Sequence, residues 1–350
     1  MAKVRVLIVD DSPTARLLLR GLLENDPEIT VVGEASNGLE GVQLAEDLKP
    51  NLITMDLNMP VMNGLQAIEE IMATCAVPIL MVSNQADARS AYEAVSKGAL
   101  EVMVKPDIQQ GEAFILKVKL LAGVPVIRHV RHYAHPYASR GRTSNPAPIL
   151  SPESRVVVVA ASTGGPQALA VILAQLLGDF PAPILIAQHN SSGFSAGMAQ
   201  WLNTLCPLTV RLPQEGESLR CGTVYLVPSE KNLTITKNRC LTLLPQRTDE
   251  IYHPNCDALL TSAANVFGSK VIGMILTGMG NDGVRGMMAI HQAKGITMAQ
   301  DESSSVVFGM NKAAIETGCI QEILSLQKIP NWLNNIVYKG VITGRITRYP

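Results

Sequence analysis

Three side chains able to catalyse acyl transfer each follow an apolar stretch typical of a strand. Ser162 follows VVVVAA, His189 closes PILIAQH, and Asp282 lies in the Gly-rich loop after VIGMILT. A serine nucleophile needs a base to take its proton, and the base needs an acid to orient it. Because the carboxyl ends of parallel strands share one edge of a sheet, the three are predicted to converge there as nucleophile, base and orienting acid.

The stretch STGGP, which begins at Ser162, has two further interpretations. Serine before a helix is most often an N-cap, and Pro166 suits the first helical turn. A glycine pair can also approach a dinucleotide pyrophosphate, but G-x-G-x-x-G is missing and PILIAQH carries no acid for a ribose. The presence of His189 and Asp282 favours the interpretation of Ser162 as a nucleophile. Ser162 is then expected to cap the helix as well, and the glycines to leave space for a tetrahedral intermediate. The backbone N–H of Met279, in GMGNDG, is predicted to stabilise its oxyanion.

A second set of polar residues lies at the ends of predicted strands in the first half. Its members are Asp10, Asp11, Asp56, Ser83 and Lys105, at the ends of KVRVLIVDD, LITMD, PILMVS and EVMVK. Carboxylates that converge repel one another unless a cation shares them. Oxygen ligands suit Mg²⁺, which keeps positions open for phosphate. Lys105 and Ser83 are then predicted to bind phosphoryl oxygens on Asp56.

The elements that must position these residues alternate between apolar strands and amphipathic helices. In the first half SPTARLLLRGLLEND predicts a helix, with Ser12 as its N-cap and Pro13 at its first position. In the second half NLTITKNRCLTLL predicts a hairpin that turns at residues 237–239. This alternation predicts the α/β class, with two doubly wound parallel-sheet domains.

The two halves are joined by a stretch without the periodicity of a helix or a strand. Residues 113–152 contain no Asp or Glu, and their end is rich in Arg, His, Pro and Ser. The spacing of His129, His132 and His135 is compatible with a metal site, but with no carboxylate or Cys nearby a polar linker is favoured. We therefore predict a first domain at 1–123, a linker at 124–154, a second domain at 155–340 and a C-terminal tail at 341–350. IVYKGVITGRITRYP, which ends in that tail, is expected to be a final strand or a loose end.

The composition limits the classes of function. Of 350 residues 47% are hydrophobic but only 4% aromatic, so the cores must be aliphatic. A net charge of −1 favours neither nucleic acid nor a membrane surface. We found no signal-peptide pattern and no apolar run long enough for membrane insertion. The six Cys form no C-x-x-C pair, which indicates reduced thiols and a cytoplasmic protein.

The first half resembles the response-regulator receiver domain across about residues 3–121. The match lies in IVDDS, MDLNMPVMNG, the Ser after ILMV and the Lys-Pro after EVMV. The resemblance implies a flavodoxin-like fold and phosphorylation of Asp56 by a histidine kinase. It also implies an Mg²⁺ site made by Asp10, Asp11, Asp56 and the backbone carbonyl of Asn58. Val102 stands where this family often has an aromatic residue, so a switch that rotates an aromatic side chain there is in doubt.

The two halves together resemble the chemotaxis protein-glutamate methylesterases of the CheB family. ASTGGP, the Gln-His of AQHNSSGF, LTGMGNDG and AQDESSSVVFGM follow in family order. The resemblance implies a Rossmann-like second domain with a β-hairpin insertion, and Ser162, His189 and Asp282 as the catalytic triad. It implies hydrolysis of γ-glutamyl methyl esters, and deamidation of glutamines, on the cytoplasmic domains of chemoreceptors. His253 stands where the family commonly has Arg, which affects substrate contacts rather than chemistry.

The resemblance also implies how the halves work together. The unphosphorylated receiver is expected to cover the catalytic cleft, and phosphorylation to expose Ser162. The esterase needs no cofactor of its own, and the chain is expected to be a monomer. One rival is a response regulator whose second domain only binds a partner. A DNA-binding regulator is disfavoured, because the second half has neither a helix-turn-helix pattern nor a strong basic face.

Overall fold

The chain folds into two compact units, residues 1–134 and 135–350 in a computed structural model. Their division falls inside the predicted linker, whose three histidines lie outside the described residues. The structure describes residues 3–84, 88–124, 126, 150–151, 154–247 and 252–345. No helix in these ranges is long and apolar enough to cross a membrane.

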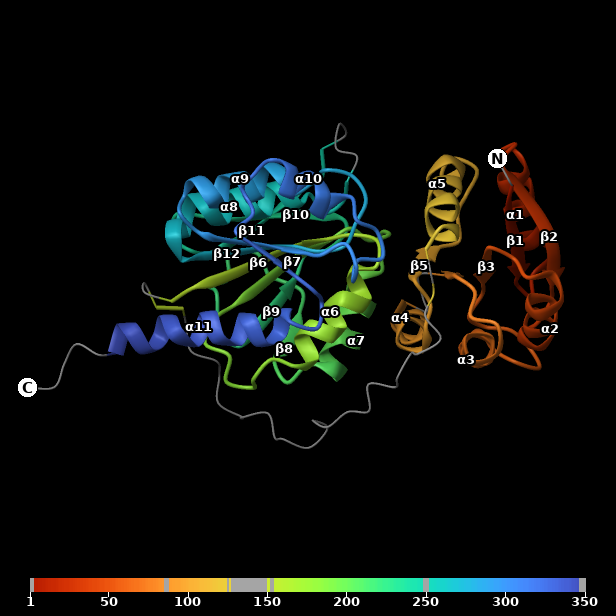
Figure 1. The fold of residues 1–350 in the computed structure, drawn as a ribbon, viewed down its shortest axis with the longest axis horizontal. Coiled ribbons are helices and arrows are strands. Elements are labelled where there is room, and N and C mark those ends of the chain that lie inside the picture. The colour runs from red at the N-terminus through yellow and green to blue at the C-terminus, as the bar shows by residue number, and fades with distance from the viewer. Residues whose placement is uncertain are drawn as a thin grey trace, which may run out of the picture. The chain divides into compact units, whose positions relative to one another are not determined.

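The first unit is a parallel sheet between two layers of helices. Its elements are β1 (Val4–Val9), α1 (Pro13–Glu24), β2 (Ile29–Ala35), α2 (Gly38–Leu48), β3 (Leu52–Met55), α3 (Gly64–Thr74), β4 (Ile79–Ser83), α4 (Ala88–Lys97), β5 (Glu101–Val104) and α5 (Gly111–Ala122). The strand order β2-β1-β3-β4-β5 is the flavodoxin-like order. Helices α1 and α5 cover one face, and α2, α3 and α4 cover the other (Figure 1).

The start of α1 confirms the predicted cap. The Ser12 hydroxyl accepts a hydrogen bond from the Ala15 N–H at 3.3 Å, and Pro13 is the first helical residue. Leu19, Leu22 and Leu23 are buried on the inner face of the helix. The cap and the apolar stripe therefore fix where α1 begins and which face it packs on the sheet that carries Asp10.

The second unit is a seven-stranded parallel sheet, again with helices on both faces. Its elements are β6 (Val156–Ala161), α6 (Gly165–Ala174), β7 (Ile184–Gln188), α7 (Ser195–Leu205), β8 (Thr209–Arg211), β9 (Thr223–Leu226), β10 (Lys231–Ile235), β11 (Leu241–Pro245), α8 (Cys256–Phe267), the 3₁₀ turn η2 (Gly268–Lys270), β12 (Val271–Ile275), α9 (Val284–Gln292), β13 (Ile296–Gln300), α10 (Met310–Glu316), β14 (Glu322–Leu324) and α11 (Ile329–Arg345). The strand order is β14-β13-β12-β6-β7-β9-β8. Two of these strands, β8 and β14, were not predicted, because three residues are too few to show a period.

The layers of the second unit follow from its apolar faces. Every residue of β6, β7 and β12 is buried, as expected of central strands covered on both sides. Helices α8, α9 and α10 lie over one face of the sheet, and α6, α7 and α11 over the other (Figure 1). The predicted hairpin is confirmed as the antiparallel pair β10–β11, which packs against α8.

The C-terminal segment is helical, so the expected final strand or loose end is wrong as far as residue 345. Ile329, Leu333 and Val337, four residues apart, are buried along one side of α11. The Tyr338 hydroxyl donates a hydrogen bond to Asp179 at 2.5 Å. The β-branched residues of IVYKGVIT favour a strand locally, but packing of this apolar stripe stabilises the helix instead.

Candidate active site and phosphorylation site

The sheet order of the second unit brings the three predicted catalytic residues to one edge. Strands β12, β6 and β7 are neighbours, and Ser162, His189 and Asp282 all follow their carboxyl ends. The Ser162 N–H donates to the Thr277 carbonyl at 3.0 Å, and the His189 N–H donates to the Ala161 carbonyl at 2.9 Å. The backbone ladders that hold the strands therefore also fix the two residues next to them.

His189 and Asp282 form a direct pair. The imidazole Nε2 lies 2.8 Å from Asp282 Oδ2, although 93 residues separate them in sequence. The Asp282 carboxylate also accepts the backbone N–H groups of Cys256 at 2.7 Å and Asp257 at 3.0 Å, at the start of α8. Burial by itself raises the pKa of Asp282, but the bonds from His189 and from these N–H groups hold it below its ordinary value. Asp282 is thus an ionised acid at neutral pH, oriented by a helix N-terminus.

Ser162 is buried and does not cap the following helix, so that part of the prediction is wrong. The N-cap of α6 is Gly164, at φ +78°, and no side chain caps this end. The Ser162 carbonyl accepts the Gly165 N–H at 2.8 Å instead. Its hydroxyl has no hydrogen-bond partner in the described part of the chain, so it remains available to react.

The glycines after Ser162 make room for the protein itself rather than for an intermediate. A Cβ on Gly164 would lie 2.5 Å from Val306 Cβ, and one on Gly165 would lie 1.9 Å from Gln188 Oε1. Both positions are thus filled by neighbouring side chains, which corrects the predicted clearance. Glycine is required here because the turn packs directly against Val306 and Gln188.

Gly278 brings the loop after β12 against Ser162. A Cβ on Gly278 would lie 2.6 Å from Ser162 Cβ. The Gly278 N–H donates to the Val307 carbonyl at 3.0 Å, and its own carbonyl accepts from Met310 N–H at 2.9 Å. The N–H of the next residue, Met279, has no acceptor among the described residues. A free backbone donor therefore follows the residue that contacts Ser162, as the predicted oxyanion site requires.

Gly278→Ala is expected to lower activity and stability together. The added methyl would also lie 2.4 Å from Met310 Sδ, so Ser162, Met310 or the loop must move, which costs about 1–3 kcal/mol of unfolding free energy. A small displacement of the candidate nucleophile is expected to slow acyl transfer by about 100-fold. Gly178→Ala is the matched control, because its Cβ would meet only Pro207 Cβ at 3.9 Å. Activity is measured as the rate of acyl transfer, and stability from urea unfolding curves. Equal rates of acyl transfer for the two variants would show that the contact between Gly278 and Ser162 does not position Ser162.

The first unit gathers its acidic residues at the carboxyl edge of its own sheet. Oxygens of Asp10, Asp11 and Asp56 lie within 4.8 Å of one another. The Lys105 ammonium is 2.8 Å from Asp10 Oδ2 and 3.2 Å from Asp56 Oδ1. The buried Ser83 hydroxyl has no partner in the described residues. A cation with phosphoryl oxygens would satisfy both the clustered carboxylates and this hydroxyl, so the donor set fits Mg²⁺.

The close approach of these charges shifts the pKa values of Asp56 and Lys105. Burial and the nearby Asp10 carboxylate raise the pKa of Asp56, although Lys105 partly offsets them. Burial works against the charged form of Lys105, but the hydrogen bonds and charges of Asp10 and Asp56 raise its pKa overall. The ammonium therefore stays protonated and neutralises only part of the negative charge.

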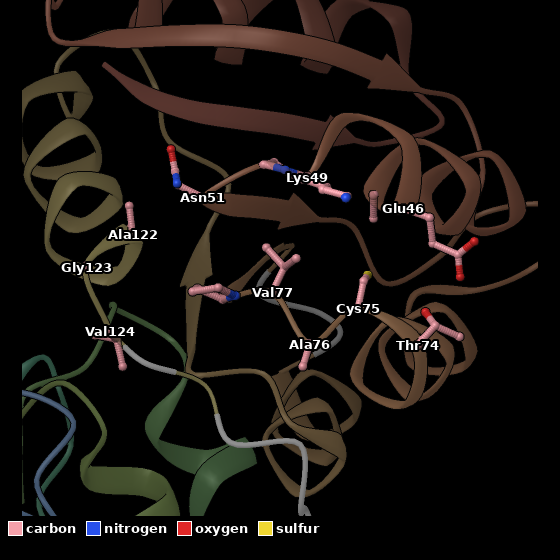
Figure 2. A pocket seen from close by; sticks show the side chains of 13 residues that line it. Glu46, Lys49, Asn51, Thr74, Cys75, Ala76, Val77, Ala122, Gly123 and Val124 are labelled. Atoms are coloured by element: carbon pink, nitrogen blue, oxygen red, sulfur yellow. The ribbon is translucent and has the colours of Figure 1, made fainter. Parts of the chain in front are cut away.

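Two cavities of the first unit lie at opposite ends of its sheet. One of about 450 Å³ includes Asp11, Asp56, Asn58 and Lys105 in its lining. The other, of about 630 Å³, lies among the segments before β3 and β4 and the end of α5 (Figure 2). Ligands of open α/β sheets bind outside the carboxyl ends of strands, so the first cavity is the candidate site.

Comparison with known families agrees with one candidate phosphorylation site in the first unit and one candidate active site in the second. The CheB methylesterase model matches residues 157–333, and the response regulator receiver domain model matches residues 6–115. The chain belongs to the CheB methylesterase family. Three similar proteins illustrate the extent of the likeness.

The protein-glutamate methylesterase/protein-glutamine glutaminase 3 of Paramagnetospirillum magneticum is 48% identical over 336 residues, which is 93% of this chain and 94% of that protein. The protein-glutamate methylesterase/protein-glutamine glutaminase 2 of Anaeromyxobacter dehalogenans is 38% identical and covers 95% of this chain and 97% of its own length. The crystal structure of the Thermotoga maritima CheB methylesterase catalytic domain is 37% identical over 54% of this chain and all of its own, with a TM-score of 0.51. The likeness thus spans both units in sequence and the second unit in structure.

Two residues of the CheB methylesterase domain contact the candidate catalytic residues, although the sequence predicted no role for them. Buried Gln188 donates from Nε2 to the carbonyls of Ser162 and His189, both at 2.8 Å, and so ties the two segments together. Tyr252 stacks on the His189 ring, with centroids 5.0 Å apart and planes 11° apart. A Gln directly before the candidate His was a visible signal for the first, whereas nothing in the sequence placed Tyr252 near His189.

The two departures from the family pattern have distinct surroundings. Val102 is buried in β5 and pairs with Met81 of β4. Its aliphatic side chain cannot act as a rotating aromatic switch. The His253 carbonyl accepts the Asn190 N–H at 3.1 Å, next to His189. His253 thus belongs to the backbone segment that borders the candidate base.

Proposed function

We propose that this chain is a phosphorylation-activated protein-glutamate methylesterase that also deamidates glutamines. Its substrates would be methylated glutamates and selected glutamines on the cytoplasmic domains of chemoreceptors, and the chain would accordingly act in the cytoplasm. The observation that carries the proposal is the His189–Asp282 pair at the same sheet edge as Ser162, within a CheB methylesterase domain. A second domain that only binds a partner would not need an oriented His–Asp pair beside a buried, unpartnered serine.

The geometry supports a Ser-His-Asp mechanism with a defined histidine tautomer. Because Nε2 faces Asp282, the nitrogen left to take the Ser162 proton is Nδ1. Ser162 Oγ attacks the γ-carbonyl carbon as its proton passes to His189, and Met279 N–H donates to the oxyanion. His189 returns the proton to the methoxide, which leaves as methanol. Water then cleaves the glutamyl-enzyme by the same steps in reverse, and an amide substrate releases ammonia instead.

The receiver half would supply the regulation. We propose that Asp56 is the phosphoryl acceptor from a chemotaxis histidine kinase, with Lys105 and Ser83 contacting phosphoryl oxygens. Mg²⁺, held by Asp10, Asp11, Asp56 and the Asn58 carbonyl, would supply the positive charge that lets phosphate approach the carboxylates. The crowded carboxylates and the unpartnered Ser83 hydroxyl support this assignment.

Phosphorylation is expected to raise the rate of methanol release. A small phosphodonor with Mg²⁺ should activate the wild-type chain, and Asp56→Asn should not respond because an amide accepts no phosphoryl group. Activation need not be complete, since moving a two-state equilibrium from 1:99 to 99:1 would take about 5.5 kcal/mol. The measurement is methanol release from methylated receptor preparations with and without the donor.

A fragment of residues 141–350 separates regulation from catalysis. If the receiver restrains the esterase, this fragment should release methanol faster than the unphosphorylated chain and ignore the phosphodonor. A fragment no faster than the unphosphorylated chain would contradict restraint by the receiver while leaving the esterase assignment intact. Absence of methanol from every form would contradict the assignment itself.

A further inference from the structure

Cys256 places a thiol beside the His–Asp pair, where the proposed mechanism has no use for it. Its sulfur lies 3.4 Å from His189 Nε2, and it donates to the Ala187 carbonyl, also at 3.4 Å. The residue is fully buried at the start of α8, and its N–H holds Asp282. Within the described residues, only two groups of three His, Cys, Asp or Glu side chains have ligand atoms close enough together to hold a metal ion. One is the receiver cluster, and the other is His189, Cys256 and Asp282.

We propose that His189, Cys256 and Asp282 form an inhibitory site for Zn²⁺. Zn²⁺ takes sulfur at about 2.3 Å and nitrogen or oxygen at about 2.0–2.2 Å, so its tetrahedral ligand atoms lie about 3.3–3.6 Å apart. The sulfur–nitrogen separation of 3.4 Å matches these spacings, and the nitrogen–oxygen separation of 2.8 Å would have to widen by about 0.5 Å as the metal replaces the shared proton. Small side-chain shifts would then seat the ion and leave its fourth position open.

The charges and donor types favour Zn²⁺ over Mg²⁺. One thiolate and one carboxylate balance the two positive charges, and a neutral imidazole completes the set. Binding releases the thiol proton to solvent as the sulfur–zinc bond forms. Asp282 Oδ1 keeps its bond from the Asp257 N–H, and Oδ2 keeps the Cys256 N–H and binds the metal in place of the His189 proton. Cys256 is fully buried and the His189 side chain is 11% exposed, so the ion would have to enter beside His189.

Zn²⁺ at this site would stop catalysis by fixing the wrong histidine tautomer. A metal on Nε2 moves the imidazole proton to Nδ1, the nitrogen that would have to accept the Ser162 proton. It also takes the Asp282 oxygen that orients the ring. Inhibition therefore rests on the proposed function, whereas binding of the metal does not.

The test uses Co²⁺ as a spectroscopic substitute for Zn²⁺ in the full chain. Excess Mg²⁺ keeps the receiver carboxylates occupied. Wild type should show a thiolate-to-cobalt charge-transfer band that Zn²⁺ removes. Cys256→Ser should lose the band and bind the metal at least about 100-fold more weakly, since loss of even an outer-shell partner costs about 10–100-fold. Cys319→Ser is the matched control, because Cys319 is also buried in this unit and donates to a backbone carbonyl. It should keep the band.

Each outcome decides one part of the inference. Absence of the band in wild type, or its persistence in Cys256→Ser, would overturn the site whatever the esterase does. Zn²⁺ should slow methanol release by wild type and Cys319→Ser at least about tenfold, and that of Cys256→Ser far less, each relative to its own metal-free rate. A band without inhibition would overturn the claim that the metal captures His189. Wild type that binds cobalt but never releases methanol would refute the proposed function and leave the metal site standing.

Discussion

Ser162→Ala is expected to abolish methanol release while phosphorylation of Asp56 persists. The hydroxyl has no partner in the described residues, so its loss breaks no hydrogen bond and should leave the fold intact. Without the nucleophile, kcat is expected to fall by at least about 10⁴-fold, as in other serine hydrolases. The measurements are methanol release and phosphodonor-dependent labelling on the same preparation.

Ser269→Ala is the control for Ser162→Ala. Ser269 is exposed in η2, directly before β12 and so at the amino edge of the same sheet. Its replacement should leave both readouts as in wild type. If Ser162→Ala kept more than a tenth of the wild-type rate, Ser162 would not be the nucleophile. The hypothesis that the second domain only binds a partner would then be favoured.

Asp282→Asn is expected to cost almost as much as loss of the nucleophile. Both Asp282 oxygens accept N–H groups, from His189 and Cys256 on one side and Asp257 on the other. An amide must turn its NH₂ group toward one of these donors. Either His189 adopts the other tautomer or a backbone N–H loses its acceptor, so kcat should fall by about 10⁴-fold. Thermal unfolding should show a loss of about 1–3 kcal/mol in stability.

Asp179→Asn makes the same chemical change away from the sheet edge. Its carboxylate bonds the Tyr338 hydroxyl on α11, so an amide there should not alter kcat. A kcat for Asp282→Asn within tenfold of wild type would mean that the acid does not orient His189. In that case the serine would have to be activated by another base.

Much of the site was predictable because its signals are local. A buried strand followed by a polar residue can be read from a few neighbouring letters, which is why Asp10, Asp56, Ser162 and His189 were placed at strand ends. The cap at Ser12 was predicted for the same reason, since its partner is three residues away. Short strands such as β8 and the helix α11 were missed, because packing against distant residues decides them.

The sequence by itself determined the two α/β units, the identity of the candidate catalytic and phosphorylated residues, and the family. Only the tertiary structure decided which imidazole nitrogen faces Asp282, since that bond joins residues 93 apart. It also decided that Ser162 does not cap α6, that Val306 and Gln188 fill the space beside the glycines, and that a thiol lies next to His189. The physical reason is that hydrogen bonds and close packing depend on the spacing of atoms brought together by the sheet, and residue types and periods along the chain do not contain that spacing.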